Sequence, residues 1–269
     1  MSVHRALLVG LGRIAWRGFP HNPAAETHYQ ALVAHPSIRL IGGVDPNDST
    51  RAEFQEVSSL LTYPTLQQAL DDSQADMLVI SSPVETHPEM VCVAATYECV
   101  RGILCEKPMA LNVDECSRMA VTCYRRDKVL LVGHQRRYEQ SHRMLRAFLK
   151  SETLGKPVGG RCTFPGEDWL NNGTHAADTM RFLLGDEVPF TLRMGKENTR
   201  VFQATVACQQ GSVMLESYAH LVSGYRRVML DDLIECMESD KHPECSADDG
   251  LEAVRATLAA EEVWRESAA

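Results

Sequence analysis

The stretch that most constrains the fold of this chain is residues 5–15, RALLVGLGRIA. The apolar run predicts a buried strand, and the glycines after it predict a tight turn into a helix. Gly10 permits the turn, Gly12 lets the backbone approach a pyrophosphate, and Ala15 takes the small position where helix packs on strand. The same spacing also occurs in strand-to-helix turns for purely steric reasons, so a second marker is needed.

Residues 38–45, IRLIGGVD, provide that marker. They form another apolar run that ends in Asp45, the acidic position expected to hold the ribose hydroxyls of a dinucleotide. The amides of Arg13 and Ile14 would then face its phosphates. A carboxylate here would repel a further phosphate, so the sequence favours NAD as cofactor, with NADP possible. Arg51 is either within reach of such a phosphate or a solvent-exposed helix residue.

Apolar runs and helical patterns alternate through the first half of the chain. Strands are expected at 75–82, 103–105 and 129–133, and helices at 28–35, 88–97 and 112–126. This alternation predicts a mostly parallel, doubly wound sheet. Ser81, Ser82 and Pro83 close one strand at the same edge as Gly10, where the backbone can run beside the dinucleotide. Residues 16–27 insert a polar loop, either on the surface or bordering the nicotinamide.

Glu106, Lys107 and Pro108 follow the apolar run 103–105 and include the first candidate catalytic group. A proline disfavours the helical conformation for the residue before it, so Lys107 should be held extended at the end of a strand. Ligands bind at the carboxyl ends of parallel strands, so its ammonium should point into a site. Glu106 would orient Lys107 or contact the cofactor ribose, although an isolated EKP also suits a simple chain turn. His87 is a candidate for a helix cap or a cofactor contact.

After about residue 135 the pattern changes. Helices are expected at 140–150, 174–185, 227–238 and 250–266, and strands at 158–164, 201–209 and 212–220, the last two forming a hairpin. Thr174 suits a helix cap, which would put His175 in the first turn, where the positive end of the helix favours a neutral base. A single His at a helix start is also commonly structural. Arg137 and Trp169 are candidate substrate-wall residues, with packing as the alternative.

Composition excludes several classes of protein. The net charge of −9 and pI near 5.6 argue against a broad nucleic-acid or anionic-membrane surface, but not against a local basic anion pocket. Nine cysteines without a CxxC pair predict buried free thiols and no metal site. The sequence has no long uncharged apolar run, so it predicts no membrane span. The amino terminus runs directly into a strand pattern, so a cytoplasmic location is expected.

These segments together resemble the Gfo/Idh/MocA oxidoreductases. The matching pieces are GLGRIA at 10–15, Asp45, SSPVETH at 81–87, EKP at 106–108, GHQRRY at 133–138 and NGTHAADTMRFLLG at 172–185. The resemblance implies an NAD(P)-binding Rossmann domain at 1–134 and a smaller α+β domain with an open, mainly antiparallel sheet at 135–269. It implies that Lys107 and His175 are catalytic. Asn171 stands where the family often has Asp, so it can only position by hydrogen bonds.

The resemblance also has consequences for assembly and activity. Relatives usually carry extra strands in the second domain, whereas residues 222–224 pass almost directly from the hairpin to the last helices. A homo-oligomer built on this sheet is possible, although a smaller sheet offers less surface for it. The predicted activity is hydride transfer between nicotinamide and a carbinol or carbonyl carbon of a sugar, inositol or related small metabolite. Alternatives are an imine or keto-sugar reductase and a non-catalytic dinucleotide-binding regulator.

Overall fold

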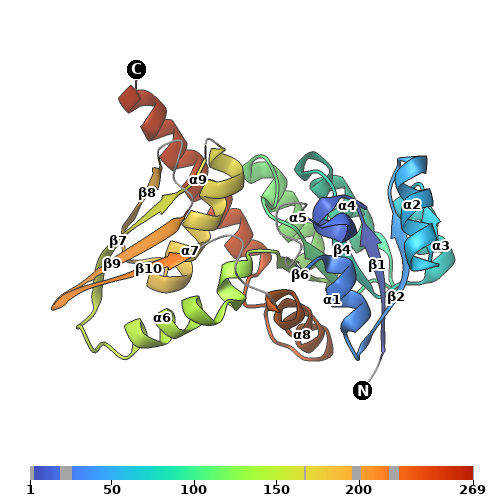
Figure 1. The fold of residues 1–269 in the computed structure, drawn as a ribbon, viewed down its shortest axis with the longest axis horizontal. Helices are drawn as coiled ribbons and strands as arrows, with labels where there is room; N and C mark the ends of the chain where they lie inside the picture. Colours follow the sequence, from blue (N-terminus) through green and yellow to red (C-terminus); the bar gives the residue numbers. More distant parts are fainter. Residues whose placement is uncertain (1–2, 19–25, 167, 196–200, 218–223, 269) are drawn as a thin grey trace.

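The computed structural model describes residues 3–18, 26–166, 168–195, 201–217 and 224–268. Its larger sheet has six parallel strands in the order β3-β2-β1-β4-β5-β6 (Figure 1). They are β1 (His4–Val9), β2 (Ile38–Val44), β3 (Leu61–Tyr63), β4 (Met77–Ile80), β5 (Gly102–Cys105) and β6 (Val129–Val132). The strand order reverses between β1 and β4, which marks the ligand-binding edge of an open parallel sheet. The predicted doubly wound sheet is confirmed.

The helices that connect these strands cover both faces of the sheet. They are α1 (His28–Ala34), α2 (Asp48–Ser58), α3 (Leu66–Ser73), α4 (His87–Thr96) and α5 (Val113–Arg125). Thr27 and Gln30 form a reciprocal capping box at the start of α1. Asn112 accepts a hydrogen bond from the amide of Glu115, which confirms the helix start expected there.

The helix expected after the glycine turn is much shorter than the spacing suggested. Residues Arg13–Arg17 make a single π-helical turn, and α1 begins only at His28. Arg13 is exposed and Ile14 is half-buried. Because so few peptide dipoles lie behind these two amides, they act as local donors and gain little from a helix macrodipole. Part of the expected insertion, residues 19–25, lies outside the described residues.

A second, four-stranded sheet has the order β10-β9-β7-β8. Its strands are β7 (Pro157–Phe164), β8 (Phe190–Met194), β9 (Phe202–Cys208) and β10 (Gly211–Ser217). The β9–β10 hairpin and the β7–β9 pair are antiparallel and β7–β8 is parallel, so the predicted mainly antiparallel sheet is confirmed. Residues 218–220 of the expected hairpin lie outside the described part.

Two helices, α6 (Gln140–Lys150) and α7 (Thr174–Leu184), pack against this second sheet. Alternate residues of β9 are buried, as expected for a strand with one face on a core. A Cβ added at Gly160 would lie 2.3 Å from Cε of Met180, so glycine allows α7 to approach β7 closely. Phe164, Met180 and Val206 are fully buried in the resulting core.

The chain then returns to the first sheet. The helix α8 (Tyr225–Glu238) contacts β5, β6 and α1, and α9 (Ala247–Ala268) contacts α5 and β6 as well as α7. Leu233 and Met237 of α8 belong to the core of the first sheet. A Cβ at Gly102 would lie 2.4 Å from Sδ of Met237, so the start of β5 needs glycine beneath this helix. The helix α9 thus joins the two sheets, while α8 packs on the first one (Figure 1).

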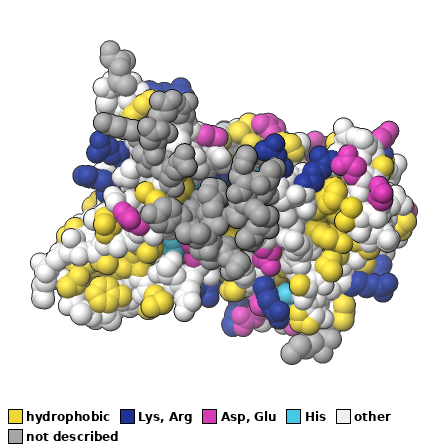
Figure 2. All heavy atoms as spheres, in the orientation of Figure 1, with side chains coloured by type: hydrophobic (Ala, Val, Ile, Leu, Met, Phe, Trp, Pro, Cys, Tyr) yellow, Lys and Arg dark blue, Asp and Glu magenta, His cyan; other side chains and the backbone are white. Residues whose placement is uncertain are grey.

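The surface view shows how charge is distributed on one face of the molecule. Lys and Arg side chains are interspersed with Asp and Glu over the described residues of the first sheet and its helices (Figure 2). Within the described ranges, none of the helices is both long and apolar enough to cross a membrane. All nine cysteines are free and seven are buried, which confirms the expected thiols.

Candidate active site

The end of β1 makes a tight glycine turn against the end of β4. Gly10 has φ +82°, and a Cβ there would lie 2.5 Å from the Cα and N of Ser82. Only glycine suits this combination of a left-handed backbone and close approach. The hydroxyl of Ser81 donates to the carbonyl of Gly10 at 3.0 Å and holds the two loops together. A Cβ at Gly12 would meet no atom within 4 Å, so the backbone there faces open space that suits a pyrophosphate.

Asp45, immediately after β2, lies beside the same turn. Its Oδ2 accepts a hydrogen bond from the amide of Leu11 at 2.9 Å, and its Oδ1 accepts from the amide of Asn47 at 2.9 Å. Each carboxylate oxygen keeps a second lone pair for a ribose hydroxyl. The guanidinium of Arg51 donates to the carbonyl of Asp45 at 2.8 Å and is paired with Asp48. These residues fit the adenosine end of a dinucleotide.

His87 links two loops of the site rather than capping a helix. Its Nε2 lies 2.9 Å from the carbonyl of Ser82, and its Nδ1 lies 3.0 Å from the carbonyl of Pro108. The ring is buried, and it makes no capping hydrogen bond to α4. A cis peptide bond joins Lys107 to Pro108. His87 therefore fixes the loop after β4 against the loop that carries Lys107.

Glu106 is a buried carboxylate with a defined set of partners. Its Oε1 lies 2.7 Å from Nε2 of His28, and its Oε2 accepts from the backbone amide of Lys107 at 3.2 Å. Burial alone would raise the pKa of Glu106, but the hydrogen bond with His28 and the positive charges of Arg226 and Lys107 lower it to about 2. Burial lowers the pKa of His28, so a neutral imidazole donates its Nε2 proton to an ionised carboxylate.

Lys107 bridges the two sheets. It follows β5, and its Nζ donates to both the side-chain oxygen and the carbonyl of Asn171, the latter at 3.3 Å. Burial lowers the pKa of Lys107, and the carboxylate of Glu106 only partly offsets that effect. The ammonium is therefore held at a fixed place by an uncharged partner.

The helical segment that carries His175 starts earlier than the sequence suggested. A π-helical stretch, Trp169–Gly173, runs directly into α7, so His175 is not in the first turn. The expected cap at Thr174 is wrong, because its hydroxyl donates to a carbonyl of the preceding turn at 2.9 Å. The cap is Asp168, whose carboxylate accepts from the amide of Asn171 at 2.8 Å. The positive end of the helix thus lies away from His175.

The imidazole of His175 is nevertheless kept neutral. Burial, followed by the positive charges of Lys107 and Arg136, lowers its pKa well below the usual value. Its ring centroid lies 5.7 Å from that of His134 and 6.0 Å from that of Phe202. Among the described residues its buried Nδ1 has no hydrogen-bond partner. A neutral ring with a free nitrogen can act as a general base.

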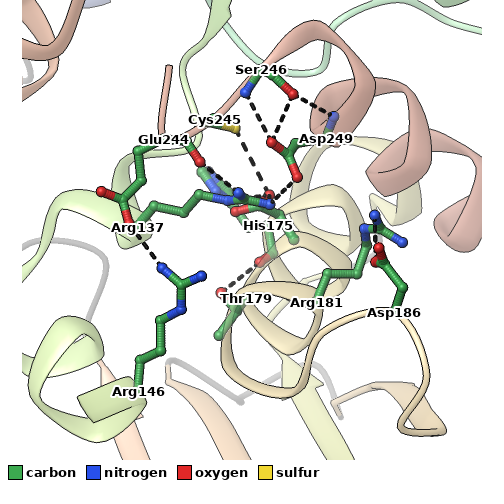
Figure 3. A network of polar contacts seen from close by, with 11 residues as sticks. Arg137, Arg146, His175, Thr179, Arg181, Asp186, Glu244, Cys245, Ser246 and Asp249 are labelled. Carbon is green, nitrogen blue, oxygen red and sulfur yellow. Dashed lines mark hydrogen bonds and ion pairs between the residues drawn. The ribbon is translucent and has the colours of Figure 1, made fainter. Parts of the chain in front are cut away.

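Arg137 is engaged in a buried ion-pair network. Its Nε donates to Asp178 at 2.8 Å, its Nη2 lies 3.0 Å from Asp249, and its Nη1 donates to the carbonyl of Glu244 at 2.6 Å (Figure 3). Burial alone would lower the pKa of Arg137, but the carboxylate of Asp178 raises it. The guanidinium holds the start of α9 against α7.

Trp169 lies in the core of the second sheet. Its ring centroid is 5.1 Å from that of Phe164 and 5.9 Å from that of Trp264. The side chain is only 4% exposed. The structure thus gives Trp169 the packing position that was the alternative to a substrate wall.

Sequence reasoning missed two residues beside His175. Arg136 is 3% exposed, and its Cζ lies 3.7 Å from the ring centroid of Phe202. Its Nε and Nη1 have no partner in the described part of the chain. Both ring nitrogens of the buried His134 also lack a partner there. The run GHQRRY drew attention to this segment, but a sequence does not show which of two adjacent arginines faces a site.

The comparisons with known proteins agree with this geometry. A family model for an oxidoreductase family with an NAD-binding Rossmann fold matches residues 4–134. The model that matches residues 4–134 is that of the Gfo/Idh/MocA family. This match confirms the resemblance seen in the sequence and the predicted NAD-binding Rossmann domain.

Two curated Gfo/Idh/MocA relatives extend the similarity beyond that domain. The chain is 27% identical over 195 residues to a myo-inositol 2-dehydrogenase of Thermotoga maritima, covering 67% of this chain and 55% of the relative. It is 25% identical over 214 residues to the rhizopine catabolism protein MocA of Rhizobium meliloti, covering 74% of this chain and 62% of that protein. The chain therefore spans a little over half the length of these relatives.

Solved structures show the same fold over nearly the whole chain. A probable dehydrogenase from Thermotoga maritima has a TM-score of 0.81 at 19% identity, covering 98% of this chain and 97% of that one. A myo-inositol dehydrogenase from Lactobacillus casei, in complex with NAD(H) and myo-inositol, has a TM-score of 0.78 at 17% identity, covering 98% and 95%. At such identities the likeness establishes the fold.

Proposed function

We propose that the protein is an NAD-dependent oxidoreductase that transfers a hydride between nicotinamide C4 and a carbinol or carbonyl carbon of a sugar, inositol or related small metabolite. One observation carries the proposal. Lys107, at the carboxyl end of β5, is hydrogen-bonded to Asn171, four residues before a buried, neutral His175 on the same helical segment. This arrangement offers a cation and a base to one substrate oxygen. The matched inositol dehydrogenase supports the polyol class.

Bound NAD would accept or supply the hydride. Lys107 would donate a hydrogen bond to the substrate oxygen and stabilise the negative charge that develops on it. His175 would take the hydroxyl proton in the oxidative direction and return it in the reductive one. Asn171 cannot exchange a proton, so its role would be to hold Nζ of Lys107 in place.

The proposed cofactor site lies along the carboxyl edge of the first sheet. Its residues come from the loops after four different strands: Gly10, Gly12, Arg13, Ile14, Asp45, Ser81, Ser82, Pro83, Glu106 and Lys107, with His87 behind them. Gly12 would meet the pyrophosphate and Asp45 the adenosine ribose. Glu106 would contact the nicotinamide ribose or fix Lys107 through its shared hydrogen bonds.

Steady-state formation of NADH with a panel of aldoses, uronates, sugar phosphates, inositols and alditols tests this function. We expect turnover with at least one member, and turnover lower by about a hundredfold or more in His175→Ala and Lys107→Met. Calorimetric titration with NADH should give the same affinity for the His175→Ala protein. NADH binding without turnover on any member of the panel, in either direction, would favour the dinucleotide-binding regulator instead.

A further inference from the structure

The guanidinium of Arg136 has more hydrogen-bond donors than the protein satisfies. Its Nε and Nη1 are buried, and neither has a partner among the described residues. Its Cζ lies 3.7 Å from the ring centroid of Phe202, and that ring also contacts the imidazole of His175, at 6.0 Å between centroids. Buried donors of a charged group are almost always paired in folded proteins. The unpaired donors therefore indicate that a ligand supplies the missing acceptor.

The carboxylates whose charges act on Arg136 are Glu139 and Asp178. Glu139 lies 3.0 Å from Nδ1 of His142, Asp178 accepts from Nε of Arg137 at 2.8 Å, and among the described residues neither is hydrogen-bonded to Nε or Nη1 of Arg136. The position nearest Nζ of Lys107 is Asn171, a neutral amide. Lys107 and Arg136 thus place two cations in one part of a protein whose net charge is −9.

The ring of Phe202 connects two of these groups, because it lies beneath the guanidinium of Arg136 and contacts the imidazole of His175. The charges of Lys107 and Arg136 both lower the pKa of His175, after burial, and the charge of Arg136 also lowers that of Lys107. The loops that carry Lys107 and Arg136 leave the adjacent paired strands β5 and β6 at the same edge. Lys107, His175 and Arg136 therefore lie in one part of the site.

We propose that the substrate carries an oxyanionic group, a carboxylate or a phosphate, which Arg136 binds while Lys107 and His175 contact the hydroxyl that reacts. This inference rests on the proposed function and narrows its substrate class from neutral polyols to acidic ones. The planar guanidinium presents parallel N–H donors that match the oxygens of such a group. Phe202 beneath the guanidinium fixes its plane.

Direct binding to the protein saturated with NADH tests the inference without requiring turnover. The calorimetric probes are matched pairs: D-glucose with D-glucuronate, D-galactose with D-galacturonate, and D-glucose with D-glucose 6-phosphate. We expect the anionic member to bind about tenfold or more tightly than its neutral partner, because hydrogen bonds to a charged group are stronger. The uronate and phosphate arms show which oxyanion the site prefers.

Substitutions test whether Arg136 causes the preference for anionic probes. Arg136→Gln should remove the preference for anions, and Arg136→Lys should retain part of it. The matched control is Arg161→Gln, an exposed arginine on β7, which should leave all affinities unchanged. Arg136→Gln is expected to fold, because it removes a buried charge whose donors are unpaired. The comparison of anionic and neutral probes on the unaltered protein gives an answer even without that variant.

Equal affinity within each pair, no binding of any anionic probe, or a preference that persists in Arg136→Gln would overturn the inference. Different results would contradict the proposed oxidoreductase activity and the proposed anion site. Turnover of neutral polyols without any preference for anions keeps the oxidoreductase and removes the anion site. Anion binding that depends on Arg136, with no NADH formed from any probe, keeps the site and contradicts the oxidoreductase.

Discussion

Nε2 of His28 lies 2.7 Å from Oε1 of Glu106, so the first residue of α1 holds the carboxylate next to Lys107. The other carboxylate oxygen accepts the backbone amide of Lys107. Glu106 therefore connects the start of α1 to the residue proposed to contact the reacting oxygen. Its ionised form depends on the hydrogen bond from His28, because burial acts in the opposite direction.

Removing His28 should affect both stability and turnover. His28→Ala leaves one buried oxygen of Glu106 without its donor, and we expect a loss of about 1–3 kcal/mol in the free energy of unfolding. Turnover should fall because the orientation of Lys107 is loosened. The control is His35→Ala, which removes the pair between another buried histidine and a carboxylate that does not belong to the site, the exposed Asp231. Urea unfolding and NADH formation measure the two effects, and equal loss of turnover in both variants would contradict a role for His28 at the site.

Substitutions of the two proposed catalytic residues should differ in their effects on kcat and on cofactor affinity. We expect His175→Ala to lower kcat about a hundredfold or more with NADH affinity unchanged, since proton-transfer assistance is typically worth that much. Lys107→Met should lower kcat comparably and also weaken cofactor placement, because Lys107 lies on the Rossmann side of the site. Steady-state kinetics and calorimetry with NADH separate the two. Full turnover in His175→Ala would leave Lys107 as the sole proton carrier.

Asn171→Asp places a carboxylate beside Nζ of Lys107, within one helical turn of His175. A nearby negative charge favours the protonated imidazole and raises the pKa of His175. The base must be neutral to accept a proton, so the acidic limb of the kcat profile should move to higher pH. The new charge should also weaken the binding of uronates relative to neutral sugars. Asn172→Asp is the matched control, and an unshifted limb in Asn171→Asp would argue against His175 as the base.

Stability should fall on the acid side. Burial lowers the pKa values of His28, His134 and His175, so below about pH 6.5 the unfolded chain binds protons that the folded chain does not. The free energy of unfolding then decreases as pH falls, by up to about 1.4 kcal/mol per pH unit for each histidine. Glu106, with its pKa lowered to about 2, adds a further loss as pH falls from about 4.5 toward that value. His134→Phe should flatten the slope between about pH 6.5 and pH 5 in thermal unfolding.

The carboxylate of Asp45 should set the choice of cofactor. It stands where the adenosine ribose is expected, and Arg51 is already paired with Asp48 and the carbonyl of Asp45. We expect NADH to bind at least several-fold more tightly than NADPH, since about 1.4 kcal/mol of repulsion gives tenfold discrimination. Asp45→Asn keeps the shape, removes the charge and should reduce the difference. Tighter binding of NADPH than of NADH to the unaltered protein, measured by calorimetry, would contradict the prediction.

The first sheet could be predicted because its signals are local. Apolar runs, glycines and strand-ending polar residues give the parallel order and put Gly10, Asp45, Ser81 and Lys107 at one edge, as found. The helix after Gly12 could not be predicted, because it ends after one π-helical turn and no propensity signals that irregularity. The helix start at Trp169, before the expected start at Thr174, could not be predicted for the same reason. The neutral imidazole of His175 was expected from a helix terminus and arises from burial instead.

Contacts between distant segments were beyond reach of the sequence. His28 and Glu106 are 78 residues apart, and no periodicity links them. Arg136 and Arg137 are adjacent and chemically identical, so only the path of the chain decides that one is unpaired beside Phe202 and the other is held by Asp178. The division into domains at residue 134 stays a prediction, because α8 adds Met229, Leu230, Leu233 and Met237 to the core of the first sheet.

That contribution of α8 bears on how the protein reaches its native state during synthesis. The strands β5 and β6 emerge from the ribosome well before α8, which is made only after the whole second sheet. Until then the apolar surface at Gly102 has nothing to cover it, and a nascent chain in that condition is prone to aggregate or to engage chaperones. We therefore expect the amino-terminal half, expressed alone, to be insoluble. Co-expressing residues 224–268 as a separate chain should then restore the solubility of the amino-terminal half.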